Sequence, residues 1–171
     1  FREFCHFSQM SSGYPADEAS LFRRFITYGG MPGLFALSNA DQPLIIEELT
    51  TLFDAIILND VARRSSVSDM DLLTKLVRYI CSTSGSLFST KKISDALTSM
   101  GRKVKPETVD NYIASLVNAF ALYSCEQEGL AGKQVFRPLR KLYPVDTGFR
   151  NLPSGFSGSD IGYQLENIVF M

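Results

Sequence analysis

Residues 87–125 read LFSTKKISDALTSMGRKVKPETVDNYIASLVNAFALYSC, and this run carries the prediction of the architecture. LFS (87–89) suits a short strand, and a compact helix follows it with Gly101 just past its end, where glycine is favoured. Pro106 is favoured in the first turn of the next helix. The apolar residues of both helices recur at helical spacing and are expected to be buried: Ile93, Ala96, Leu97 and Met100 in the first, and Val109, Tyr112, Ile113, Leu116, Val117 and Phe120 in the second.

A further helix is predicted just before this run. In SVSDMDLLTKLVRYICSTSG (66–85), Ser68 and Asp71 have the spacing of a capping box, and Leu72, Leu73, Leu76, Val77 and Ile80 share one face. Downstream, 121–125 and 134–138 predict a hairpin around a Gly-containing loop, and 139–148 could add a third strand. Helix, strand, helix, turn, helix and hairpin is the order of a winged helix-turn-helix. We therefore expect a mainly α fold with a small β-hairpin wing.

The first 65 residues predict helices only. Leu21, Phe22, Phe25 and Ile26 recur at helical spacing, and GGMPG (29–33) must end that helix because glycine and proline do not continue it. Pro43 opens a second helix that extends to about Asp60. We expect one helical region over 1–65, a winged helix-turn-helix domain over 66–151, and a linker with the start of a further, truncated domain over 152–171. The apolar ending Val169-Phe170-Met171 is the reason for expecting a continuation.

Two polar features near the end of the chain have structural predictions of their own. Asp146, followed by Thr147 and Gly148, favours an Asx-type turn that ends the third strand. Glu166 and Asn167 lie in an otherwise apolar helix and are candidates for a buried polar contact.

Composition narrows the class of protein. The chain has 171 residues and a net charge of −1, and no apolar run reaches the roughly 20 residues of a membrane span. Its three cysteines include no C-x-x-C pair, which favours reduced, mostly buried thiols in a cytoplasmic protein. Residues 1–72 hold 5 basic and 10 acidic side chains, whereas residues 73–171 hold 12 basic and 8 acidic ones. The second part is therefore the better candidate to meet an anionic partner.

No pattern of catalytic residues is found. The chain lacks a phosphate-binding G-x-x-x-x-G-K-[ST] loop and a G-x-S-x-G nucleophile elbow. Its single histidine, His6, has no Cys or acidic residue at metal-ligand spacing. We therefore expect no enzyme activity, no metal site and no cofactor in this chain.

The helix that begins at Pro106 is the first place to look for a binding surface. In helix-turn-helix modules the N-terminal half of this helix enters the major groove of DNA, and basic residues nearby reach phosphates. Glu107 and Asp110 on the same face would repel DNA and would suit a basic protein partner instead. Two interpretations stay open, DNA contact and a protein-interaction or regulatory module. The candidate DNA-binding residues are Arg102, Lys103, Lys105, Thr108, Asn111, Lys133, Arg137 and Arg140.

Six runs carry a resemblance to a known family. They are FREFCHF (1–7), FITYGGMPG (25–33), IILNDVARR (56–64), TVDNYIASLVNAFALYSC (108–125), RKLYPVDTGFRN (140–151) and SDIGYQLENIVF (159–170). In this order they resemble the region that follows the nucleotide-binding core in a family of bacterial and archaeal AAA-type ATPases. The C-terminal portion of that family has no settled function and often ends in a restriction-endonuclease-like fold. The last two runs are the most specific.

The resemblance implies that this chain is a non-catalytic fragment of an ATP-driven parent. The parent's P-loop, which would bind ATP and Mg²⁺, would lie upstream, and a nuclease-like domain would lie downstream. That ATPase core, that domain and double-stranded DNA are the implied partners. Residues 1–65 would be the ATPase lid, and Arg63 or Arg64 could reach the γ-phosphate, as lid arginines do. Alternatively, these arginines pair with Asp60 or Asp69 or cap their helix. Glu166 could join a metal site of the nuclease-like fold.

Overall fold

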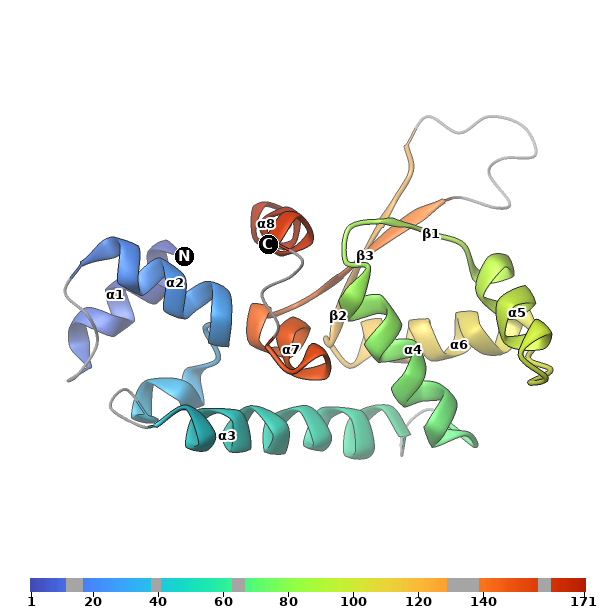
Figure 1. The fold of residues 1–171 in the computed structure, drawn as a ribbon, viewed down its shortest axis with the longest axis horizontal. Coiled ribbons are helices and arrows are strands. Elements are labelled where there is room, and N and C mark those ends of the chain that lie inside the picture. The colour runs from blue at the N-terminus through green and yellow to red at the C-terminus, as the bar shows by residue number, and fades with distance from the viewer. Residues whose placement is uncertain (12–16, 38–40, 63–66, 129–138, 157–160) are drawn as a thin grey trace.

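The chain folds into an elongated, mainly helical body with one small sheet, seen in a computed structural model that describes residues 1–11, 17–37, 41–62, 67–128, 139–156 and 161–171 (Figure 1). The predictions for Arg63, Arg64, Lys133, Arg137 and the strand 134–138 lie outside the described residues. Among the described residues, no helix has both the length and the apolar character that a membrane span requires.

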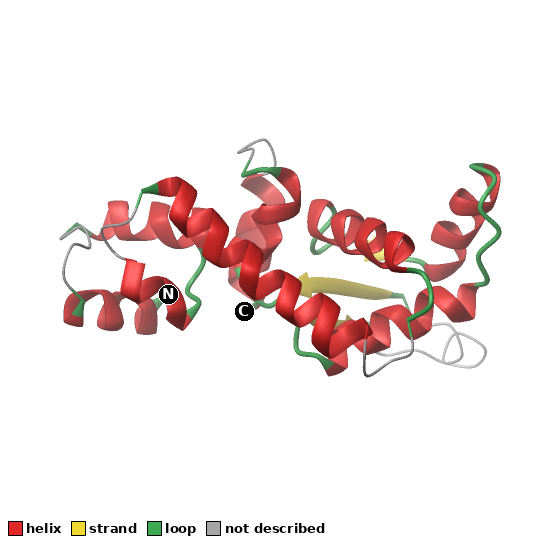
Figure 2. Cartoon of the chain, turned by 90° about the horizontal axis from the view of Figure 1, so that it is seen from below, coloured by secondary structure: helices red, strands yellow, loops and turns green. Residues whose placement is uncertain are grey.

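The first part of the chain consists of helices, as expected. They are α1 (Arg2–Met10), α2 (Glu18–Tyr28), a 3-10 helix η1 (Pro32–Leu37), α3 (Gln42–Asp54) and a π-helical segment η2 (Ala55–Ala62). Asp17 caps α2 by accepting from the Ser20 N–H, which is a common way to begin a helix. Gly29, with φ of 82°, ends α2 in a conformation that favours glycine. α3 and η2 follow one another as one long helix across the middle of the molecule (Figure 2).

The second part contains three helices and the sheet. They are α4 (Met70–Ser82), β1 (Leu87–Phe88), α5 (Thr90–Ser99), α6 (Pro106–Asn118), β2 (Leu122–Glu126) and β3 (Arg140–Pro144). The sheet is antiparallel with the order β1-β3-β2, so β3 is central. The register places Leu122 opposite Pro144 and Glu126 opposite Arg140. The described partner of β2 is thus 140–144, the segment expected as a third strand.

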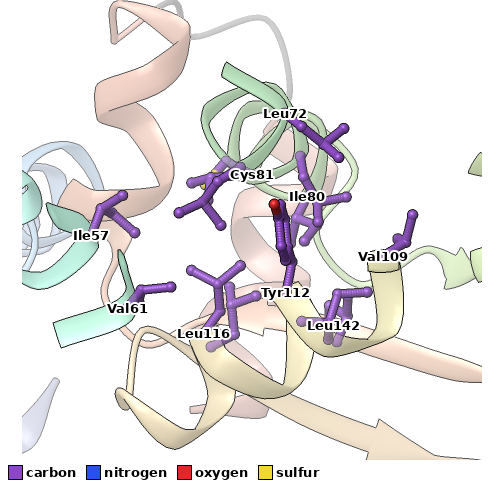
Figure 3. Close-up of a cluster of buried hydrophobic side chains, with 14 of the residues drawn as sticks. Ile57, Val61, Leu72, Ile80, Cys81, Val109, Tyr112, Leu116 and Leu142 are labelled. Carbon is purple, nitrogen blue, oxygen red and sulfur yellow. The ribbon is translucent and has the colours of Figure 1, made fainter. Parts of the chain in front are cut away.

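The main core lies between α4, α6, η2 and the sheet. Leu72 and Ile80 of α4, Val109 and Leu116 of α6 and Leu142 of β3 point toward one another (Figure 3). The expected burial of Leu72, Leu73, Leu76, Val77 and Ile80 in α4 is confirmed, as is that of Val109, Tyr112, Ile113 and Leu116 in α6. The helical spacing of apolar residues therefore identified the correct inward faces of these two helices.

The end of the chain joins the two parts. α7 (Thr147–Asn151), a short 3-10 helix η4 (Leu152–Ser154) and α8 (Ile161–Phe170) follow β3. Phe149 of α7 enters a second core with Leu34, Ile45 and Leu49 from the first part. α8 lies against the sheet, where Phe170 stacks on Tyr143 with ring centroids 3.8 Å apart. Residues 145–156 therefore pack against both parts of the chain.

Several local predictions were wrong. The cap of α4 is Asp69, which accepts from the Leu72 N–H, and not Ser68. Phe120 is 78% exposed because the backbone turns there with φ of 55° at the end of α6. Met100 and Ala96 of α5 are also exposed, because this helix presents only a narrow face to α6. Cys125 is exposed, because its β2 side chain points away from the core, while Cys81 is buried.

α8 has an unexpected orientation. Its buried residues are the polar Gln164 and Asn167, whereas Ile161 and Leu165 are exposed and Val169 is 85% exposed. Asn167 accepts a hydrogen bond from the Ser84 hydroxyl at 2.6 Å and donates to the carbonyl of Pro144 at 3.1 Å. The predicted buried polar contact is thus confirmed for Asn167.

Candidate interaction groove beside α6

A groove of about 650 Å³ lies between the starts of α5 and α6 and the ends of β2 and β3. Its apolar lining comes from Phe88, Pro106 and Leu139. Among the described residues, its charged lining contains four carboxylates and two cations, a net of −2 for these six groups. They are Asp95, Glu107, Asp110 and Glu126, with Lys91 and Arg140. The groove is therefore acidic, although the sequence of the second part is basic.

Arg140, a predicted phosphate contact, is held inside the groove. Its guanidinium forms an ion pair with Asp110 and donates to the Thr90 hydroxyl at 3.2 Å. The Thr90 hydroxyl donates in turn to Asp110 at 2.8 Å. The guanidinium also lies 5.8 Å from the ring centre of Phe88, within the range of a cation–π contact. With its side chain only 20% exposed, Arg140 is already neutralised by its neighbours.

Arg102, the second arginine predicted to reach DNA, is engaged in the same way. It forms ion pairs with both Asp69 and Asp71 at the start of α4. Hydrogen bonding from Arg102 lowers the pKa of Asp69, and hydrogen bonding to Asp69 raises the pKa of Arg102. The two ion pairs join the α5–α6 turn to the start of α4, so two carboxylates already neutralise the charge of Arg102.

The other predicted contacts lie at the start of α6. Lys103 and Lys105 are exposed, and in the described part of the chain neither has an ion-pair partner. Asn111 is exposed and Thr108 is half-buried. Glu107, beside Lys105, is exposed and faces the groove. Of the predicted contacts that the described ranges contain, Lys103, Lys105, Thr108 and Asn111 thus have no carboxylate partner, and the carboxylate of Glu107 lies beside them in the sequence.

The groove also contains residues that sequence reasoning missed. Asp95 forms an i, i+4 pair with Lys91 at 2.8 Å on α5, and Glu126 ends β2 opposite Arg140. Neither residue belongs to a motif. They meet only because α5 and the strand ends converge, so no local signal could have identified them.

Glu166 is hydrogen-bonded to two side chains of β3. It accepts from the Lys141 ammonium at 2.6 Å and from the Tyr143 hydroxyl at 3.2 Å. Hydrogen bonding from Lys141 lowers the pKa of Glu166. Among the described residues, no cluster of three His, Cys, Asp or Glu side chains could hold a metal ion. Glu166 therefore fastens α8 to the sheet.

Comparisons with known proteins place these features in a family. Residues 19–160 match the family described as a domain of unknown function (DUF8612). An uncharacterized protein of Haemophilus influenzae is 33% identical over 171 residues, which is all of this chain and 42% of that protein. An uncharacterized protein of Methanocaldococcus jannaschii is 26% identical over 177 residues, which is all of this chain and 39% of that protein. The chain thus spans about two fifths of these relatives. No solved structure matches.

Proposed function

The chain belongs to the DUF8612 family, and we propose that it is a non-catalytic segment of an AAA-type ATPase whose winged helix binds a basic segment of a protein. One observation carries the proposal. Arg102 and Arg140, which a DNA-binding surface would need, are neutralised by Asp69, Asp71 and Asp110, while the groove beside α6 keeps an excess of carboxylates.

The winged-helix part of the proposal is supported by topology. The order α4, β1, α5, α6, β2, β3 and the sheet order β1-β3-β2 are those expected of a three-helix core with a strand pair on one side. In a winged helix α6 would be the recognition helix, and Gly101 with φ of 87° makes the turn before it. The groove lies between the start of α6 and the end of the β2–β3 pair at which Glu126 faces Arg140.

Charge favours a basic peptide over a nucleic acid in this groove. Phosphates would meet Glu107 and Glu126, neither of which has an ion-pair partner in the described ranges. Because like charges brought together cost free energy, these carboxylates would weaken a complex with a nucleic acid. A Lys- or Arg-rich segment would meet opposite charge at these positions and apolar surface on the exposed Leu139.

The ATPase part of the proposal rests on the family resemblance of the six sequence runs. The matched relatives are more than twice as long as this chain, which leaves room for a nucleotide-binding core. The test is ATP binding and hydrolysis by the full-length Haemophilus influenzae relative. A protein that neither binds nor hydrolyses ATP would overturn this part.

The groove is tested by fluorescence anisotropy with a labelled Lys/Arg-rich peptide and, separately, a labelled DNA duplex. We expect the peptide to bind, and Glu107→Lys to weaken it about tenfold because repulsion replaces attraction. The matched control is Glu47→Lys, which makes the same charge change on the exposed face of α3. Peptide binding that is absent, or equally affected by both variants, would contradict the proposal.

Duplex DNA is the second candidate partner, supported by the two exposed lysines before α6. If DNA binds at low salt, the logarithm of the affinity should fall linearly with the logarithm of the salt concentration. The double variant Lys103→Ala/Lys105→Ala should then reduce that slope by about 2. DNA binding with this signature, together with no peptide binding, would replace the protein-contact proposal.

A further inference from the structure

The helices α1 and α2 have a small core of their own. Phe4, Leu21 and Phe25 form it, with Phe35 of η1 and Ile168 of α8 packed against them. It is separate from the core around α4 and α6 and from the core around α3 and Phe149. In Figure 1 the pair lies at the opposite end of the molecule from α5. α1 and α2 therefore share an apolar core that is distinct from the two cores of the rest of the protein.

The junction between α2 and α7 is polar. Helix ends leave carbonyl groups that need donors from elsewhere. Asn151 of α7 donates through Nδ2 to the carbonyls of Ile26 at 2.8 Å and Thr27 at 2.9 Å. The Thr147 hydroxyl donates to the carbonyl of Phe25 at 2.5 Å. Two buried side chains of α7 thus cap the C-terminal end of α2.

Two consecutive glycines lie beside this junction. Gly29 and Gly30 follow α2, and Gly29 is in the left-handed half of backbone space. The Gly30 N–H donates to Asp146 Oδ2 at 2.8 Å, while Asp146 Oδ1 accepts from the Gly148 N–H at 2.8 Å. Asp146 therefore ties Gly30 to the start of α7, which is itself anchored in the second core by Phe149.

We propose that α1 and α2 form a latched arm, which opens as a unit at Gly29–Gly30 when the caps from Thr147 and Asn151 release the end of α2. Local units of a protein open with lower free energy than the whole when few buried apolar contacts hold them. Other attachments of the arm among the described residues are of two kinds. Phe35, Ile168 and Phe156 make apolar contacts with it, the last with Tyr28 at the end of α2 at 5.7 Å between ring centroids, and Arg24 donates to the carbonyl of Leu37 at 3.3 Å. Opening leaves the core of α4 and α6 intact.

The test is native-state hydrogen exchange on the whole chain, followed amide by amide. In the wild type, amides of α2 should exchange through an opening that leaves α4 and α6 protected. Thr147→Val removes one donor with little change of shape, and the exchange of α2 should become roughly fivefold faster. Asn151→Asp keeps the Oδ1 acceptor that Arg150 and Gln164 donate to but turns an oxygen toward two carbonyls. Asn151→Asp should accelerate the hydrogen exchange of α2 more strongly than Thr147→Val does.

The matched control is Val109→Ala, which opens a cavity in the core of α4 and α6. It should accelerate exchange in those helices, and in α2 only through the opening of the whole molecule. The latch is refuted if α2, α4 and α6 exchange with one common free energy in the wild type and shift together in every variant. Acceleration of α4 and α6 by Thr147→Val equal to that of α2 would refute it as well.

Discussion

Gly148→Ala tests how closely α7 packs against the C-terminal end of α2. An added Cβ would lie 2.8 Å from the carbonyl carbon of Tyr28, closer still to its oxygen, and 2.9 Å from Asp146 Oδ1. Ordinary contacts of a Cβ begin at about 3.4 Å. Both neighbours at Tyr28 are backbone atoms and cannot rotate away, so α7 must move from α2.

The size of the effect follows from two contributions. Overpacking of this kind costs about 1–3 kcal/mol. The shift also weakens the hydrogen bonds from Thr147 and Asn151 to the end of α2, each worth about 1 kcal/mol. Loss of the flexibility of glycine in the unfolded chain offsets roughly 0.4–1 kcal/mol. We expect a net loss of about 3 kcal/mol, a large share of the 5–15 kcal/mol that stabilises most domains.

The assay is urea unfolding followed by far-ultraviolet circular dichroism, with Gly162→Ala as the control. Gly162 lies in α8 with no atom within 4 Å of its added Cβ, so that substitution should be neutral or stabilising by up to about 1 kcal/mol. A stability of Gly148→Ala within about 0.5 kcal/mol of the wild type would refute the close approach of α7 to Tyr28.

Two further predictions concern the end of α8 and the buried thiol. Asn167→Leu should destabilise the protein by about 2–4 kcal/mol in the same urea assay, because it leaves the Ser84 hydroxyl and the Pro144 carbonyl without a partner. Adding Ser84→Ala should restore part of this loss. Additive effects of the two substitutions would count against the contact. Burial raises the pKa of the Cys81 thiol from 9.0 to about 12, because the buried site disfavours the charged thiolate. The free energy that keeping this thiol neutral adds to folding is complete below pH 9. It is lost as the pH rises toward 12, by up to about 4 kcal/mol. The urea midpoint of the wild type should therefore fall more steeply over this range than that of Cys81→Ala, and parallel curves would contradict the prediction.

The local features of the fold were largely predictable. Pro43, Pro106 and Gly101 mark helix ends through local backbone preferences, and the structure places each at such an end. The turn at Asp146 was also predictable, because its carboxylate accepts from the N–H groups of Gly148 and Phe149, two and three residues further on. Phe120 shows the limit, since its helical spacing indicated burial but the helix ends before it.

The candidate groove was much less predictable. Lys103, Lys105, Arg102 and Arg140 have the same charge in the sequence, and nothing local distinguishes the exposed pair from the neutralised one. Arg140 lies 30 residues from Asp110, and Arg102 lies 33 residues from Asp69. Whether a cation is available to a partner depends on which carboxylate the fold brings beside it.

The sequence alone specified where most helices begin and end and which faces of α4 and α6 turn inward, because caps and helical spacing act over a few residues. Tertiary packing determined which charged side chains line the groove beside α6. It also determined where α1 and α2 contact the rest of the protein. The Gly30 amide meets Asp146 across 116 residues of chain. Such contacts depend on how distant elements pack, and the spacing of residues along the chain does not predict them.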